Sequence, residues 1–203
     1  MVAMRVVLTI GSLMVFAGLC QAQVLAPQST AATSIPVAKV SPAQKRALQL
    51  DKLLGQLHGE PKSADVSKTE SDIWALWSQN DSATAVLLLR QSSAALDARD
   101  FEPAEQMLSQ LIESYPDFAE GWNRRGALYY LMKRYDAALI DIEHALALEP
   151  RNFGALLGKG MILKAQNKTD EAVAAFNDAL LINPHLDAAR DAIKIIEKED
   201  PHI

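Results

Sequence analysis

The stretch that decides the fold runs from residue 122 to residue 150 and reads WNRRGALYYLMKRYDAALIDIEHALALEP. Its apolar and small residues recur at helical spacing on both sides of a short polar break at Lys133 and Arg134. Pro150 closes the stretch, because proline cannot continue the hydrogen-bond ladder of a helix. This pattern predicts two amphipathic helices folded back on each other as a hairpin.

The same pattern recurs on both sides of this stretch at a fixed step of 34 residues. Proline ends successive units at positions 116, 150 and 184, and alanine recurs in the second helix at 104, 138 and 172. The small residues let two helix backbones approach closely, and large residues such as Trp122 and Tyr129 fill the space between hairpins. We therefore place three repeats at residues 85–118, 119–152 and 153–186.

The recurring positions resemble the signature of the tetratricopeptide repeat (TPR). In the central repeat they are Trp122, Gly126, Tyr129, Tyr135, Ala138, Ile142, Ala145 and Pro150. The first repeat departs most from the signature, because Ser92 stands where the later repeats have glycine. The resemblance covers residues 85–186, about half of the chain, and implies an all-α fold, a right-handed α-solenoid of helix hairpins.

Both flanks of the repeats predict further helices. Residues 42–80 form a helical pair: one helix starts at Pro42 with Ser41 as its cap, and a short one near residues 70–79 carries two tryptophans. When the repeat frame is extended backwards, this pair is a degenerate, repeat-like unit that continues the stack against the first full repeat. At the other end, the charged amphipathic segment 187–199 predicts a capping helix.

The first 22 residues have the pattern of a secretory signal peptide. Arg5 precedes an apolar run over residues 6–19, and small residues precede a cleavage point at Gln23. The run is short for a bilayer span of roughly 20 residues, which disfavours an uncleaved anchor, and Leu19 fits poorly before a lipidated Cys20. Residues 23–41 are rich in Ala, Ser, Thr, Gln and Pro and predict a flexible linker. We expect a periplasmic protein.

The sequence offers no pattern for catalysis or for metal binding. The net charge of −5 and the lack of a broad basic stretch argue against nucleic acid as a partner. The four histidines lack the spacing of metal ligands, and the only cysteine, Cys20, leaves with the signal peptide. No phosphate-binding loop or nucleophile turn is present. We predict a non-enzymatic protein without a cofactor or a bound metal.

The TPR resemblance implies a ligand-binding concave wall built from the first helix of each repeat. It assigns partner contacts to Leu89, Leu96, Glu120, Asn123, Tyr130, Leu131, Leu157, Met161 and Lys164. The apolar residues among them suit an amphipathic segment of another protein, and the chain's own N-terminal helix or linker is the alternative occupant. TPR clamps for acidic C-terminal peptides use several Lys and Asn residues on this wall. Only Asn123 and Lys164 are present here, so that ligand is not expected.

Arg125 stands where TPR-like sequences usually have leucine, and Lys159 holds the same position in the next repeat. Two interpretations follow: an ion pair with a carboxylate such as Asp141, or an aliphatic stem that packs while its charged head stays in water. The second is favoured from the sequence.

As a whole, the chain resembles exported bacterial TPR proteins of the cell envelope. This resemblance implies an adaptor or scaffold that binds a protein partner and supports envelope integrity or assembly. Two alternatives remain open. One is a self-associating structural module. The other is a membrane-peripheral protein held by the basic helix at residues 42–58.

Overall fold

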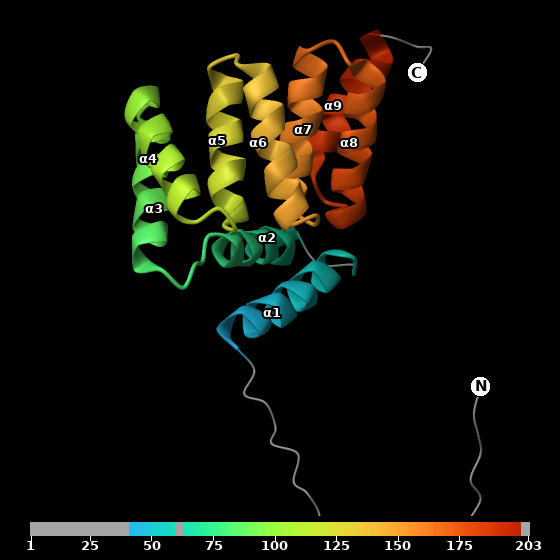
Figure 1. Cartoon of the computed structure of the whole chain (residues 1–203). Helices are drawn as coiled ribbons and strands as arrows, with labels where there is room; N and C mark the ends of the chain where they lie inside the picture. Colours follow the sequence, from blue (N-terminus) through green and yellow to red (C-terminus); the bar gives the residue numbers. More distant parts are fainter. Residues whose placement is uncertain (1–40, 60–62, 200–203) are drawn as a thin grey trace, which may run out of the picture. The chain divides into compact units, whose positions relative to one another are not determined.

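The computed structural model describes residues 41–59 and 63–199, and every regular element in these ranges is an α-helix (Figure 1). The predicted all-α solenoid is therefore confirmed. The predicted signal peptide, and the linker up to residue 40, lie outside the described residues. The helices are α1 (Pro42–Leu57), α2 (Ser63–Trp77), α3 (Ala83–Asp97), α4 (Phe101–Ser114), α5 (Ala119–Leu131), α6 (Tyr135–Leu148), α7 (Phe153–Ala165), α8 (Thr169–Ile182) and α9 (Asp187–Glu199).

Helices α3 to α8 form three hairpins that pack side by side, and α9 adds one more helix after α8 (Figure 1). The small residues of the repeat frame lie where close packing needs them. The alanines at positions 104, 138 and 172 are fully buried. A Cβ added at Gly126 would lie 2.8 Å from Ile142, and one at Gly160 would lie 2.4 Å from Phe176. Glycine thus lets the second helix of the second and third hairpins press directly against the first.

The turn inside each hairpin repeats as regularly as the helices. Arg99, Lys133 and Asn167 all adopt a left-handed backbone conformation, with φ of 57°, 59° and 60°. In each turn the next residue donates its N–H to a carbonyl five residues earlier, as Arg134 does to Tyr129 at 2.8 Å. This arrangement satisfies carbonyls that the end of a helix leaves free. It fixes the angle at which the second helix returns.

Helices α1 and α2, which we call the N-terminal hairpin, differ from the sequence prediction. Helix α2 starts at Ser63, earlier than the expected residue 70, and the hairpin does not continue the stack ahead of α3. Instead it runs across the ends of the later repeats (Figure 1). The reason is that this position buries the apolar area of the two tryptophans. The rings of Trp74 and Trp77 lie 5.6 and 5.0 Å from the ring of Phe153 at the start of α7. Their partner is the third repeat, not the first.

The apolar face of helix α1 is buried inside the protein. Four of its leucines are buried in a cluster with α2 and Phe153: Leu50, Leu53, Leu54 and Leu57. Ser41 caps the helix as predicted, with its hydroxyl accepting from the backbone of Gln44. A membrane-bound α1 would first have to expose these leucines. Within residues 41–59 and 63–199, no helix has the length and apolar character needed to cross a bilayer.

Candidate binding wall

First helices α5 and α7, together with α9, surround an open hollow of about 500 Å³ on the side of the array where the sequence predicts partner contacts. We call this cavity the hollow. Its lining comes from the later positions of the first helices, from Phe176 of α8 and from one face of α9. The lining residues include Tyr130, Met161, Lys164, Ala165, Ala188, Asp191, Ala192 and Ile195.

The hollow combines exposed apolar side chains with charges. Met161 is 40% exposed and Ile195 is 49% exposed, both high values for side chains of this type. Lys164 lies 3.7 Å from Glu199 in a solvated ion pair, and Asp191 accepts a hydrogen bond from Lys194. An apolar surface bordered by charges is the arrangement that binds a bulky side chain of another chain and orients the backbone around it.

The structure brings three of the predicted contact residues together in the hollow: Tyr130, Met161 and Lys164. Leu131 lies at the end of α5 and is 55% exposed, so it is accessible next to them in sequence. Leu96 and Leu157 are only partly buried, and each packs against a hydrophobic core cluster. Whether these residues contact a partner stays a prediction.

Three other predicted contacts are not available on the surface. Leu89 is a core residue, 4% exposed, while Glu120 and Asn123 are 1% and 8% exposed. The Glu120 carboxylate accepts hydrogen bonds from Asn123 at 3.0 Å and from Arg124 at 2.7 Å. Sequence spacing places a residue on a helix face, but it does not show whether another element covers that face. Here the N-terminal hairpin lies over the start of α5.

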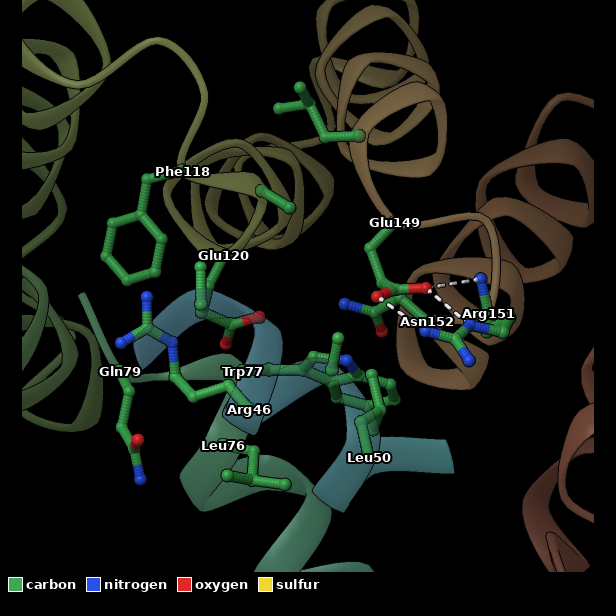
Figure 2. Close-up of a pocket in the computed structure, with 14 residues that line it drawn as sticks. Arg46, Leu50, Leu76, Trp77, Gln79, Phe118, Glu120, Glu149, Arg151 and Asn152 are labelled. Atoms are coloured by element: carbon green, nitrogen blue, oxygen red, sulfur yellow. Dashed lines mark hydrogen bonds and ion pairs between the residues drawn. The ribbon is translucent and has the colours of Figure 1, made fainter. Parts of the chain in front are cut away.

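Figure 2 shows this covered region, where a gap of about 240 Å³ separates the N-terminal hairpin from the array. Arg46 and Leu50 line it from α1, Leu76 and Trp77 from α2, and Glu120 from α5; the α6–α7 connection closes another side. The buried indole N–H of Trp77 has no hydrogen-bond partner among the described residues. The repeat pattern does not predict this gap, and its one sequence signal is the pair of tryptophans on a short helix.

The hairpin covers the first turn of α7 as well. A Cβ at Gly154 would lie 2.1 Å from the Trp74 ring, so the indole rests directly on the glycine backbone. The alternative occupant of the wall was the chain's own N-terminal helix or its linker; the N-terminal hairpin lies over the part of the wall near the helix starts, and the linker lies outside the described residues. The hollow at the other end of the wall stays open to a different occupant.

Arg125 makes an ion pair with Asp141, the interpretation that the sequence favoured less. Its guanidinium donates to both carboxylate oxygens of Asp141, at 2.7 and 2.9 Å, and also reaches Ser109. The side chains of the pair are only 17% and 3% exposed, so the charged head is not in water. The interpretation with a solvated charged head is wrong, because the neighbouring helix α6 presents the Asp141 carboxylate within hydrogen-bond distance of the largely buried guanidinium.

Among residues 41–59 and 63–199, no group of three or more His, Cys, Asp and Glu side chains could hold a metal ion.

Comparison with known proteins identifies the family. Tetratricopeptide repeat models match residues 74–117, 119–152 and 153–186. A TPR repeat-containing protein of Rhizobium etli is 30% identical over 173 residues, which cover 85% of this chain and 85% of that protein. The chain belongs to the tetratricopeptide repeat family. The second and third matches have the bounds that the 34-residue step assigns, whereas the first begins inside α2.

Solved structures show the same fold at lower identity. The first TPR domain of Spaghetti (RPAP3), bound to the HSP90 peptide SRMEEVD, aligns with a TM-score of 0.57 at 20% identity, covering 59% of this chain and 94% of that one. MamA aligns with a TM-score of 0.56 at 17% identity, covering 79% of this chain and 85% of its own. At these identities the likeness concerns the fold alone.

Proposed function

We propose that this TPR protein is a non-enzymatic interaction module that binds a segment of a partner protein in the hollow between α5, α7 and α9. The observation that carries the proposal is the hollow itself, which leaves Met161 and Ile195 exposed beside Tyr130. Helical arrays of this kind offer an extended wall to a peptide or a helix, and apolar anchors supply most of the affinity. The membership in the TPR family supports this use of the wall.

The chemistry of the hollow favours a partner segment with one bulky apolar residue. Such a side chain would bury the exposed apolar atoms of Met161 and Ile195, while Lys164 and Asp191 would bind polar groups on either side of it. The structural neighbour RPAP3 holds an acidic HSP90 peptide. We do not propose that ligand here, because Lys164 already pairs with Glu199 and Asp191 adds negative charge.

Photo-crosslinking tests the site. A photoreactive amino acid at Tyr130 or at Met161 should capture a discrete partner in cells, and one at Ile140 should not. Ile140 is a matched control because it is 57% exposed on α6 and does not line the hollow. Crosslinks of equal yield at all three positions, or none at Tyr130 and Met161, would contradict the proposal. Capture of a second copy of this chain would favour the self-association alternative.

We further propose that the chain works as an adaptor or scaffold in a bacterial cell envelope after export. The support is the sequence alone: Arg5, the apolar run over residues 6–19 and the small residues before Gln23. Fractionation followed by N-terminal sequencing tests this separately from partner binding. A periplasmic product that starts at Gln23 is expected, and a full-length product confined to the cytoplasm would refute export.

A further inference from the structure

The N-terminal hairpin is fastened to the far end of the array by hydrogen bonds around the end of α1. The Nε2 atom of His58 lies 2.9 Å from the carbonyl oxygen of Leu181 at the end of α8. In return, Nε2 of His185 lies 2.9 Å from the carbonyl oxygen of Leu57. Nearby, the Asn183 amide donates to Glu70 of α2 at 2.6 Å. These contacts join residues more than a hundred positions apart.

His58 differs from His185 in that its ring must be protonated to make both of its hydrogen bonds. Its second ring nitrogen, Nδ1, lies 3.0 Å from the carbonyl oxygen of Leu54, so both ring nitrogens face acceptors. A neutral imidazole carries only one N–H, and both contacts are hydrogen bonds only when the ring is protonated. Within the described residues the His185 ring has one polar contact, to the carbonyl oxygen of Leu57, and a neutral tautomer satisfies it.

We propose that His58 is a proton-operated clasp, which fastens the N-terminal hairpin over the start of α5 and α7 when protonated and loosens it when the proton leaves. Loss of the proton puts a nitrogen lone pair against one of the two carbonyl oxygens, and that contact becomes repulsive. The other polar and charged groups at this junction are His185, the Glu70 carboxylate on Asn183, and Arg190 of α9, which pairs with Asp187 and donates to the carbonyl oxygen of Pro184.

The direction of the pH effect follows from the hydrogen bonds. The carbonyl oxygens of Leu54 and Leu181 hold the pKa of His58 above its usual value of 6.5. A group with a raised pKa in the folded state stabilises that state fully below its usual pKa, and the stabilisation is lost as the pH rises through the raised value. The clasp is therefore closed in mild acid and weaker in mild alkali.

Loosening would uncover the Trp74 site on Gly154 and the buried pair Glu120 and Asn123. The hairpin joins the array through residues 78–82, and α2 does not pack along α3, so the hairpin can move as a unit. More of the binding wall would therefore be exposed at higher pH. Only this effect on binding rests on the proposed function. The clasp can be measured with no partner present.

Hydrogen–deuterium exchange of the full chain, followed by mass spectrometry, tests the clasp between pH 6.0 and 8.5. Peptides from α4 in the same sample correct for the intrinsic pH dependence of exchange, because α4 belongs to the array and not to the hairpin. Protection of α1 and α2 relative to α4 should fall about five-fold as the pH rises, the size expected for losing one charge-assisted hydrogen bond at a partly solvated site. His58→Gln should remove the pH-dependent step, and His185→Gln should keep it.

The proposal is overturned if the relative protection of α1 and α2 in the unmodified chain does not change with pH. It is also overturned if the pH-dependent step persists in His58→Gln. A step that is lost in both variants overturns the assignment to His58 alone. Intact protection of α4 in every variant shows that the array is folded. A failure of crosslinking at Tyr130 and Met161 would refute the proposed function and leave this result unaffected.

Discussion

Replacing Arg125 with leucine tests the buried ion pair of the central repeat. The substitution restores the residue usual at this repeat position, and it removes the partner of a carboxylate that is 3% exposed. Breaking a buried pair by removing one charge costs about 3–5 kcal/mol, since the other charge stays buried alone. The new leucine packs beside Trp122 and Tyr129 and recovers about 1–2 kcal/mol of apolar burial.

The net expectation is a loss of about 1–4 kcal/mol in the free energy of unfolding. For a folded unit of this size, each kcal/mol lowers the melting temperature by about 2–4 °C, so a drop of roughly 2–16 °C is expected. Urea unfolding followed by circular dichroism gives the free energy directly, and a thermal melt gives the temperature.

Lys159→Leu is the matched control, because Lys159 holds the same repeat position one unit later. Its ammonium lies 3.4 Å from Glu143, and the two side chains are 32% and 55% exposed. Exposed pairs of this kind contribute about 0–1 kcal/mol, so this variant should change little. The double variant Arg125→Leu with Asp141→Leu should recover most of the loss, since no unpaired charge remains. Equal stability of the two leucine variants, or no recovery in the double variant, would refute the reasoning.

Three further substitutions probe the covered end of the wall, each measured by urea unfolding. Gly154→Ala should destabilise the protein by about 1–3 kcal/mol, because the added methyl group would meet the Trp74 ring. Its control, Gly158→Ala, should be neutral or stabilising by up to about 1 kcal/mol. The opposite order of stabilities would contradict the packing. Trp77→Phe removes a buried N–H that has no partner in the part of the chain that the structure describes and should cost less than about 2 kcal/mol, so a larger loss would point to an unseen acceptor. Asn152→Ala removes the side-chain cap of α7 and should cost about 0.5–2 kcal/mol; no change would mean that the cap is dispensable.

The repeats were predictable because their signature is local. Each hairpin depends on residues within 34 positions of one another, and the small residues at Gly126 and Ala138 specify how closely its two helices pack. The candidate wall was predictable in part for the same reason. Tyr130, Met161 and Lys164 belong to first helices at fixed repeat positions, and the stacking of repeats brings them together.

The burial of Glu120 and Asn123 was not predictable in this way. Both positions follow the frame of the wall, but the N-terminal hairpin, a helix pair outside the repeats, lies over Glu120, and Asn123 is buried with its amide donating to the Glu120 carboxylate. The pairing of Arg125 with Asp141 was one of two interpretations that the sequence left open, and it was the less favoured one, although the structure has it. Only the position of the carboxylate on the facing helix decides between an ion pair and a solvated head.

The sequence by itself determined the all-α class, the 34-residue step and the helix face on which partners are expected. It also showed that Trp74 and Trp77 must pack against an apolar partner, because two indole rings on one short helix carry a large apolar area. Only the tertiary structure decided that the partner is Phe153, some eighty residues further on, and that the hairpin lies across the wall. Contacts between elements distant in sequence depend on the fit of two finished surfaces, and a linear pattern carries no measure of that fit.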